Sequence, residues 1–152
     1  MGSEHLDSKR KNPDPAESLL RAFHRPRLWV LLGVGMVGLV MLGSLLPARD
    51  LPPVPFNGFD KVQHLLGYAA LSTYAVMLFA RPRMQAICAV GLVVLGVGLE
   101  FAQASMTNSR QADPADALFN SLGVLAGLLV AATPLAALLQ RVDCRLWGQA
   151  RG

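Results

Sequence analysis

The sequence predicts an all-α protein, a four-helix transmembrane bundle with both termini in the cytoplasm. Three observations lead to this fold class. Hydrophobic residues make up 53% of the 152 residues and charged residues only 16%, whereas about 25% of a soluble domain is charged. The apolar residues are gathered into four long blocks. The basic residues lie almost entirely on one side of those blocks.

The four apolar blocks define one membrane domain over residues 28–139. The first block contains 19 uncharged residues, which as a helix extend roughly 28 Å, close to the hydrocarbon thickness of a bilayer. The turn Arg81-Pro82-Arg83 is so short that the second and third spans must be antiparallel neighbours. The predicted spans are at about 28–46, 61–80, 84–105 and 116–139.

The domain is flanked by two polar tails, 1–27 and 140–152, which we expect in the cytoplasm. In the first tail, Asp14 and Pro15 are typical of a helix start. The apolar positions that follow, up to Phe23, share one helical face. This pattern predicts a short amphipathic helix lying in the membrane interface, with an unstructured basic tail as the alternative.

The distribution of basic residues sets the orientation. Of the 14 Lys and Arg residues, all but Arg49, Lys61 and Arg110 fall in the two tails or in the turn at 81–83. Basic residues are retained on the cytoplasmic side of membrane proteins. The start of the second span, the end of the third and the start of the fourth therefore face the outside.

Three polar clusters lie at this outer side. Spacings of three and four residues place the members of a cluster on one helical face. Charged groups inside a span are costly and usually mark function, so we expect the three clusters to converge on one working site. The candidate site residues are Asp60, Lys61 and His64, then Glu100 and Gln103, then Arg110, Asp116 and Asn120.

A structural interpretation of the same residues stays open. In it, Asp60 and Asp116 cap their helices, and Glu100 pairs with Lys61 or Arg110 to hold the bundle together. Capping does not explain Glu100, because it lies a turn or more inside its span.

The fourth span begins with a clear capping pattern, Asp113 followed by Pro114, which leaves Asp113 outside the predicted site. Gly123 and Gly127 continue the polar stripe of this span at steps of three and four. They predict close packing against a neighbouring helix.

The chemistry of the clusters admits several interpretations. Asp60, His64, Glu100 and Asp116 are acceptable ligands for a divalent ion, but their spacing is not diagnostic, so the sequence predicts no metal site and no cofactor. A histidine beside a carboxylate also suits acid–base catalysis. No nucleophile motif or phosphate-binding loop accompanies it, and enzymatic activity stays an open question. The scattered basic residues argue against a nucleic-acid partner.

Together these motifs resemble the VanZ-like family of bacterial membrane proteins. The resemblance covers about residues 47–131. It implies a multi-pass protein of the bacterial plasma (inner) membrane and carries over the eight polar positions. The family takes its name from a protein linked to resistance to the glycopeptide antibiotic teicoplanin, and most members have no assigned biochemical activity. The matching elements are Asp60-Lys61-x-x-His64-x-x-x-Tyr68, Glu100-x-x-Gln103, Arg110 and Asp116-x-x-x-Asn120-x-x-Gly123-x-x-x-Gly127.

We expect the protein to have one of three functions. The first is an outer-facing site that binds lipid or cell-wall precursor headgroups, or that modulates sensitivity to a glycopeptide, with membrane lipids as partners. The second is an intramembrane enzyme that acts on a lipid-linked substrate, with His64 and a carboxylate as acid and base. The third is a structural subunit of a membrane complex or oligomer, assembled through the glycines of the first span (Gly33, Gly35, Gly38 and Gly43) and of the fourth.

Overall fold

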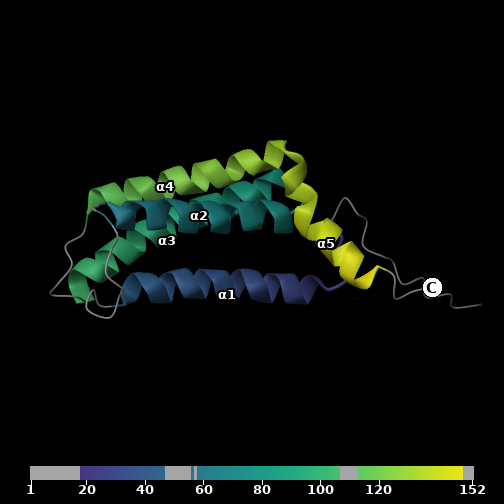
Figure 1. Ribbon diagram of the computed structural model, residues 1–152, viewed down its shortest axis with the longest axis horizontal. Helices are drawn as coiled ribbons and strands as arrows, with labels where there is room; N and C mark the ends of the chain where they lie inside the picture. The colour runs from purple at the N-terminus through teal and green to yellow at the C-terminus, as the bar shows by residue number, and fades with distance from the viewer. Residues whose placement is uncertain (1–17, 47–55, 57, 107–112, 149–152) are drawn as a thin grey trace, which may run out of the picture.

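The computed structural model describes residues 18–46, 56, 58–106 and 113–148, and these residues form an almost entirely helical structure without an assigned strand. The all-α class is therefore confirmed. Figure 1 shows α1 to α4 lying along one another and α5 slanting away at one end. The elements are α1 (Pro26–Leu45), α2 (Phe59–Leu78), α3 (Pro82–Met106), α4 (Pro114–Leu129), the 3₁₀ turns η2 (Val130–Ala132) and η3 (Pro134–Ala137), and α5 (Leu138–Trp147).

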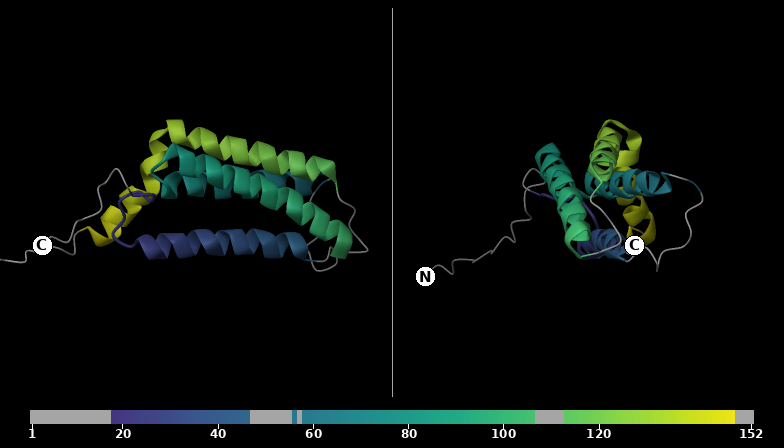
Figure 2. Two further views of the ribbon diagram at one scale, coloured as in Figure 1. Left: turned by 180° about the vertical axis from the view of Figure 1, so that it is seen from behind. Right: turned by 90° about the vertical axis from the view of Figure 1, so that its left-hand side faces the viewer.

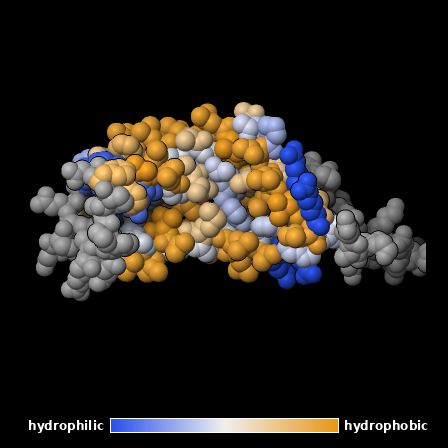
Figure 3. Space-filling view, in the orientation of Figure 1, coloured by the Kyte–Doolittle hydropathy of each residue, from blue (hydrophilic) through white to orange (hydrophobic). Residues whose placement is uncertain are grey.

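Three segments among the described residues are long and apolar enough to cross a membrane: Pro26–Leu45, Pro82–Ser105 and Pro114–Ala132. Apolar side chains also cover most of the visible surface between the two ends, and the hydrophilic residues gather near those ends (Figure 3). Such a surface suits lipid rather than water. The remaining long helix, α2, is less apolar because its first two turns carry Asp60, Lys61 and His64.

The tightest helix pair is α2 with α4. The backbones approach closely because α4 presents glycine to α2: a Cβ atom built on Gly123 would lie 2.3 Å from the Leu65 carbonyl oxygen. One turn on, a Cβ atom on Gly127 would lie 2.5 Å from the Ser72 side chain. Small residues permit this approach between membrane helices. The buried core beside this contact consists of Tyr68, Leu71, Ala89, Leu92 and Val124.

Helix α1 packs more loosely, on the opposite side of α2 from α4 (Figure 2). Its one buried residue is Trp29. The hydroxyl of Tyr74 donates a hydrogen bond to the Trp29 carbonyl oxygen (2.6 Å), which ties α1 to α2 near the start of α1. Apolar side chains such as Leu31 and Leu39 remain about 70% exposed, which leaves most of α1 free to face lipid or another helix.

The fourth span differs from its prediction. The sequence predicted one helix to about Leu139, but α4 ends at Leu129 and the chain continues as 3₁₀ turns. Pro134 is the physical reason, since proline lacks an N–H and clashes with the preceding helical turn. The Thr133 side chain accepts a hydrogen bond from the Leu135 N–H (3.3 Å) and starts the new turn.

The segment before α1 also differs from its prediction. The interfacial helix was predicted from Asp14 to Phe23, and the part up to residue 17 lies outside the described residues. Residues 18–25 are not helical. Their backbone instead bonds to the end of α2, with Arg21 N–H donating to the Leu78 carbonyl (3.0 Å) and Ala80 N–H donating to the Leu19 carbonyl (3.0 Å).

The tail after the fourth span contains a docked helix that the sequence did not predict. Helix α5 carries Asp143, which is fully buried. Its carboxylate accepts hydrogen bonds from the His24 backbone N–H (2.5 Å), the Arg25 N–H (3.3 Å) and the Trp29 indole N–H (2.8 Å), and also contacts the His24 ring (2.8 Å). One carboxylate therefore fastens the two ends of the described chain together.

Candidate polar site at one end of the bundle

The polar clusters meet because of the helix order. The short turn between α2 and α3 makes these helices antiparallel, and α4 then runs in the same direction as α2 (Figure 1). The starts of α2 and α4 and the end of α3 consequently lie at one end of the bundle. The partial positive charges of the two helix N-termini favour carboxylates there.

Lys61 is the cationic centre of this end. Its ammonium lies 2.9 Å from Asp113 Oδ2, 3.5 Å from Asp116 Oδ1 and 3.5 Å from Asp60 Oδ2. Asp113 also caps α4, because its side chain accepts a hydrogen bond from the Ala115 N–H (2.9 Å). The hydrogen bond from Lys61 lowers the pKa of Asp113. Asp113 thus has the predicted capping role and a second role in the site that the sequence did not predict.

His64 connects α2 to α4. Its Nδ1 lies 3.0 Å from the side-chain oxygen of Asn120, and its Nε2 lies 3.7 Å from Asp116 Oδ2. An amide oxygen can only accept a hydrogen bond, so Nδ1 carries the hydrogen in the neutral ring. The Nε2 lone pair then points toward the carboxylates. Asp60 lies four residues before His64, a spacing that lets two helical side chains meet, but among the described residues the ion pair of Asp60 is with Lys61.

Glu100 is the most unusual member of the site. It is 6% exposed, and neither carboxylate oxygen accepts a hydrogen bond of good geometry among the described residues, although the backbone of Asp113 lies close to it. The buried hydroxyl of Tyr68 and one oxygen of Asp116 also lack a hydrogen-bond partner there. Ligand atoms of His64, Glu100 and Asp116 all lie within 4.8 Å of one another. A buried charge without partners destabilises a protein strongly, so the position of Glu100 favours a ligand that supplies the missing partner.

The remaining predicted residues have different positions. Gln103 is buried, and its amide donates to the Ser44 carbonyl oxygen (2.6 Å), which ties the end of α3 to the end of α1. The side chain of Asp60 is about half exposed, and Gly58 rather than Asp60 is the N-cap of α2. Arg110 lies outside the described residues. Among the described residues, Gln103 is therefore the predicted site residue that contacts α1 instead of the other polar side chains.

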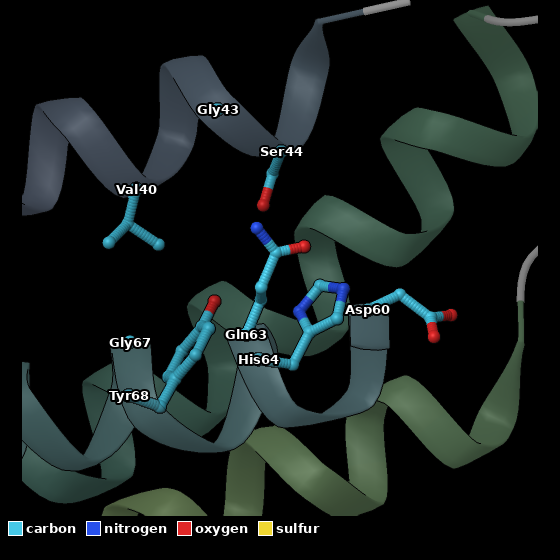
Figure 4. A pocket seen from close by; sticks show the side chains of 8 residues that line it. All are labelled: Val40, Gly43, Ser44, Asp60, Gln63, His64, Gly67 and Tyr68. Atoms are coloured by element: carbon cyan, nitrogen blue, oxygen red, sulfur yellow. The ribbon is translucent and has the colours of Figure 1, made fainter. Parts of the chain in front are cut away.

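A cavity of about 220 Å³ opens beside the site, between α1 and α2. Figure 4 shows the His64 and Tyr68 side chains pointing from α2 into this space, whereas Asp60 points away. Polar and apolar groups both line it, so it suits a molecule with a polar end. Its lining residues are Val40, Gly43, Ser44, Asp60, Gln63, His64, Gly67 and Tyr68.

A second cavity, of about 280 Å³, lies between α3 and α4 and is lined in part by Glu100, Phe101 and Ala117. Glu100 therefore lines the second cavity, whereas His64, whose ligand atom lies within 4.8 Å of that of Glu100, lines the first. Tyr68 lies four residues after His64, so helical spacing alone is enough to place it next to the site. Ser44 on α1 lines the first cavity and accepts a hydrogen bond from Gln103, but no pattern in the sequence predicts these contacts.

No protein-family model matches the chain, and no curated protein or solved structure matches it either.

Proposed function

We propose that this chain is a four-span protein of the bacterial plasma membrane, VanZ-like in its motifs, whose outward-facing site binds the polar headgroup of an envelope lipid or lipid-linked cell-wall precursor. The observation that carries the proposal is a cavity with polar and apolar lining, together with the buried carboxylate of Glu100 within 4.8 Å of the His64 side chain that lines it.

The four-span topology is supported by three features. Helix α2 has 20 residues, which is the length needed to cross a bilayer. It lies between the more apolar helices and carries its charges only at its start. The basic residues of the 81–83 turn and of both tails favour the cytoplasm for the opposite end. In this orientation the polar site belongs to the outer leaflet.

The position of the cavity supports a membrane lipid as ligand. It lies between α2 and the loosely packed α1, whose outer surface is apolar and exposed. A lipid headgroup can enter between these helices while its chains stay in the bilayer. A volume of about 220 Å³ is smaller than a typical pocket for a drug-sized ligand, which favours a headgroup.

A steric block of the cavity tests headgroup binding. A Cβ atom on Gly43 has open space around it, so Gly43→Leu is tolerated by the helix and projects a side chain into the cavity. We expect lipid retention, measured by native mass spectrometry of the purified protein with added phosphatidylglycerol or polyprenyl pyrophosphate, to fall about tenfold. Gly35→Leu is the matched control on the same helix, because Gly35 is equally open but does not line the cavity. Equal retention by both variants contradicts the proposal.

A role in glycopeptide sensitivity follows if the ligand is a cell-wall precursor. We expect cells that carry Glu100→Ala or Asp116→Ala to change in sensitivity to a lipoglycopeptide by at least fourfold relative to wild type. Immunoblots of membrane fractions must show equal expression. Unchanged sensitivity in both variants excludes this role.

An intramembrane enzyme is the second candidate function. The observation that favours it is the lone pair of His64 Nε2 facing Asp116 beside an unpartnered Glu100, because a general base needs such a free acceptor near its substrate. Lipid analysis of a deletion strain distinguishes the two functions. An enzyme predicts that one lipid-linked substrate accumulates, whereas a binding protein predicts an unchanged set of lipids.

A further inference from the structure

We infer that His64, Glu100 and Asp116 form a binding site for one divalent cation of the Zn²⁺ class, and that this ion holds a phosphate-bearing headgroup. The metal site stands on the geometry of the three side chains. The headgroup part rests on the proposed function and assigns its ligand class.

The three side chains come from three helices and supply the ligands that Zn²⁺ prefers. Their ligand atoms lie within 4.8 Å of one another. Zn²⁺ binds imidazole nitrogen and carboxylate oxygen at about 2.0–2.2 Å, so ligand atoms around one ion are roughly 3–4 Å apart. Small rotations of the His64, Glu100 and Asp116 side chains would bring their ligand atoms to this separation. Three protein ligands also leave a coordination position open, as in catalytic or substrate-binding zinc sites.

Asn120 prepares His64 for this role. A metal-binding histidine usually fixes its second ring nitrogen by a hydrogen bond. Here the Nδ1 of His64 pairs with the side-chain oxygen of Asn120 at 3.0 Å. The hydrogen on Nδ1 leaves the Nε2 lone pair free, on the side of Asp116.

The carboxylates of Glu100 and Asp116 have too little positive charge near them, which favours a bound cation. Lys61 lies 3.5 Å from Asp116 Oδ1 and is shared with Asp60 and Asp113. Glu100 has no cationic partner at ion-pair distance among the described residues, although it is buried. A divalent ion neutralises the carboxylates of Glu100 and Asp116 together and removes the cost of their proximity.

A second group with metal-binding residue types, His24, Asp143 and Cys144, has a different character. The oxygens of Asp143 already accept hydrogen bonds from backbone N–H groups and from the Trp29 indole. Such a carboxylate has its acceptor capacity filled and needs no ion. His24 therefore offers a control for His64 at the other end of the molecule.

The metal ion also explains how a site rich in carboxylates can accept a phosphate. Among the described residues of this end, the carboxylates of Asp60, Glu100, Asp113 and Asp116 outnumber the single ammonium of Lys61, and alone they repel an anionic headgroup. A divalent cation offsets part of this negative charge and is itself a positive centre that an anion can contact. Its open coordination position can then take a phosphate oxygen from the adjoining cavity.

Metal content and thermal stability of the full chain test the metal site. The purified protein in detergent is stripped with a chelator, incubated with Zn²⁺ or Mn²⁺ and washed. We expect one ion per chain in the wild type and at least tenfold less in Glu100→Gln and His64→Ala, measured by elemental mass spectrometry. His24→Ala is expected to retain the ion. Loss of metal in His24→Ala but not in His64→Ala overturns the proposal, as does a wild type that binds none.

The thermal stability of Glu100→Gln is a second test, which can be read even if another variant folds poorly. In chelator, the neutral amide removes an unpartnered buried charge, so we expect its melting temperature to equal or exceed that of the wild type. Added Zn²⁺ is expected to raise the melting temperature of the wild type only. A lower melting temperature of Glu100→Gln in chelator means that the chain itself, for example through Arg110, already pairs with this carboxylate, and the proposal is then wrong.

Lipid retention with and without metal tests the ligand class. We expect Zn²⁺ to increase retention about tenfold for the lipid that binds, and comparison of phosphatidylglycerol with polyprenyl pyrophosphate identifies the source of the phosphate. Gly43→Leu is expected to bind Zn²⁺ like the wild type but to retain about tenfold less lipid, which separates the two sites. Lipid retention that is independent of Zn²⁺ refutes the metal-held headgroup and leaves the proposed function intact. Metal binding without any lipid retention refutes the proposed function instead.

Discussion

Gly123→Ala is expected to destabilise the protein by about 3 kcal/mol, because overpacking a tight contact costs about 1–3 kcal/mol or more. The added Cβ atom would lie 2.3 Å from the Leu65 carbonyl oxygen and 3.0 Å from the Ala69 nitrogen. Both are backbone atoms of α2, so the whole helix must move. At about 2–4 °C per kcal/mol for a chain of this size, the melting temperature of the purified protein in detergent should fall by roughly 10 °C.

The control substitutions separate packing from the intrinsic effect of alanine. Gly38→Ala on α1 meets open space, and alanine is the better helix former by about 1 kcal/mol, so this variant should be as stable as the wild type or slightly more stable. Gly127→Ala should be destabilised like Gly123→Ala, because its Cβ atom would lie 2.7 Å from the Ala69 carbonyl oxygen. A Gly123→Ala protein with wild-type stability contradicts the close α2–α4 contact.

The same contact positions the candidate site. Asn120 precedes Gly123 by one turn on α4, and His64 is next to Leu65 on α2. Separation of the helices at Gly123 therefore lengthens the 3.0 Å contact between His64 and Asn120. Gly127 lies a further turn away, so Gly127→Ala should harm stability more than ligand binding. Comparison of the two variants shows how far the site depends on this packing.

Much of the fold could be predicted because hydrophobic length and proline act locally. The uncharged run closed by Pro47 and the Arg81-Pro82-Arg83 turn gave the spans around α1 and α3 to within about three residues. The capping pattern at Asp113 also agrees with the observed start of α4. Each of these features is decided by a few neighbouring residues, without knowledge of the tertiary structure.

The errors arose where tertiary contacts compete with local pattern. The apolar run after Leu129 continues without a charge, and only the effect of Pro134 on the backbone reveals that the α-helix ends. The segment up to Phe23 has helical periodicity, yet around Arg21 its backbone bonds to the end of α2. The docking of α5 depends on Asp143, a single acidic residue in a tail with no motif around it.

In the candidate site, the arrangement of residues within one helix could be predicted, but the contacts between helices could not. The spacing of four residues puts His64 and Tyr68 on one side of α2, and both point into the cavity (Figure 4). Pairing between helices, such as His64 with Asn120, depends on relative depth and rotation that spacing does not contain. For the same reason the sequence grouped Gln103 with Glu100, although Gln103 contacts α1.

Asp143→Ala is expected to destabilise the protein by about 3 kcal/mol. The substitution leaves the Trp29 indole N–H and the His24 and Arg25 backbone N–H groups without their acceptor, and each unsatisfied buried donor costs about 1–3 kcal/mol, less where water can reach it. Trp29 and Trp147, whose rings lie 6.1 Å apart, are the two tryptophans of the chain. Their fluorescence should shift to longer wavelength as α5 undocks.

Asp143→Asn keeps one acceptor oxygen and should lose roughly half as much stability. Cys144→Ser, at the adjacent exposed position, should behave like the wild type in both melting temperature and fluorescence. If Asp143→Ala leaves the tryptophan emission unchanged, the carboxylate does not hold α5 against the start of α1.

The stabilisation by Asp143 should also depend on pH in a defined direction. Burial by itself raises the pKa of this carboxyl, but hydrogen bonds from the His24 and Arg25 backbone and the Trp29 indole outweigh it and hold the pKa below its usual range. The usual value is about 3.9. Because the folded pKa is the lower one, the contribution is complete above the unfolded value and is lost as pH falls through the folded value.

The difference in melting temperature between wild type and Asp143→Ala should therefore be constant from about pH 7 to 5 and shrink below about pH 4. Measurement in a His24→Ala background removes the contacting imidazole, and a difference that grows toward low pH would contradict a depressed pKa.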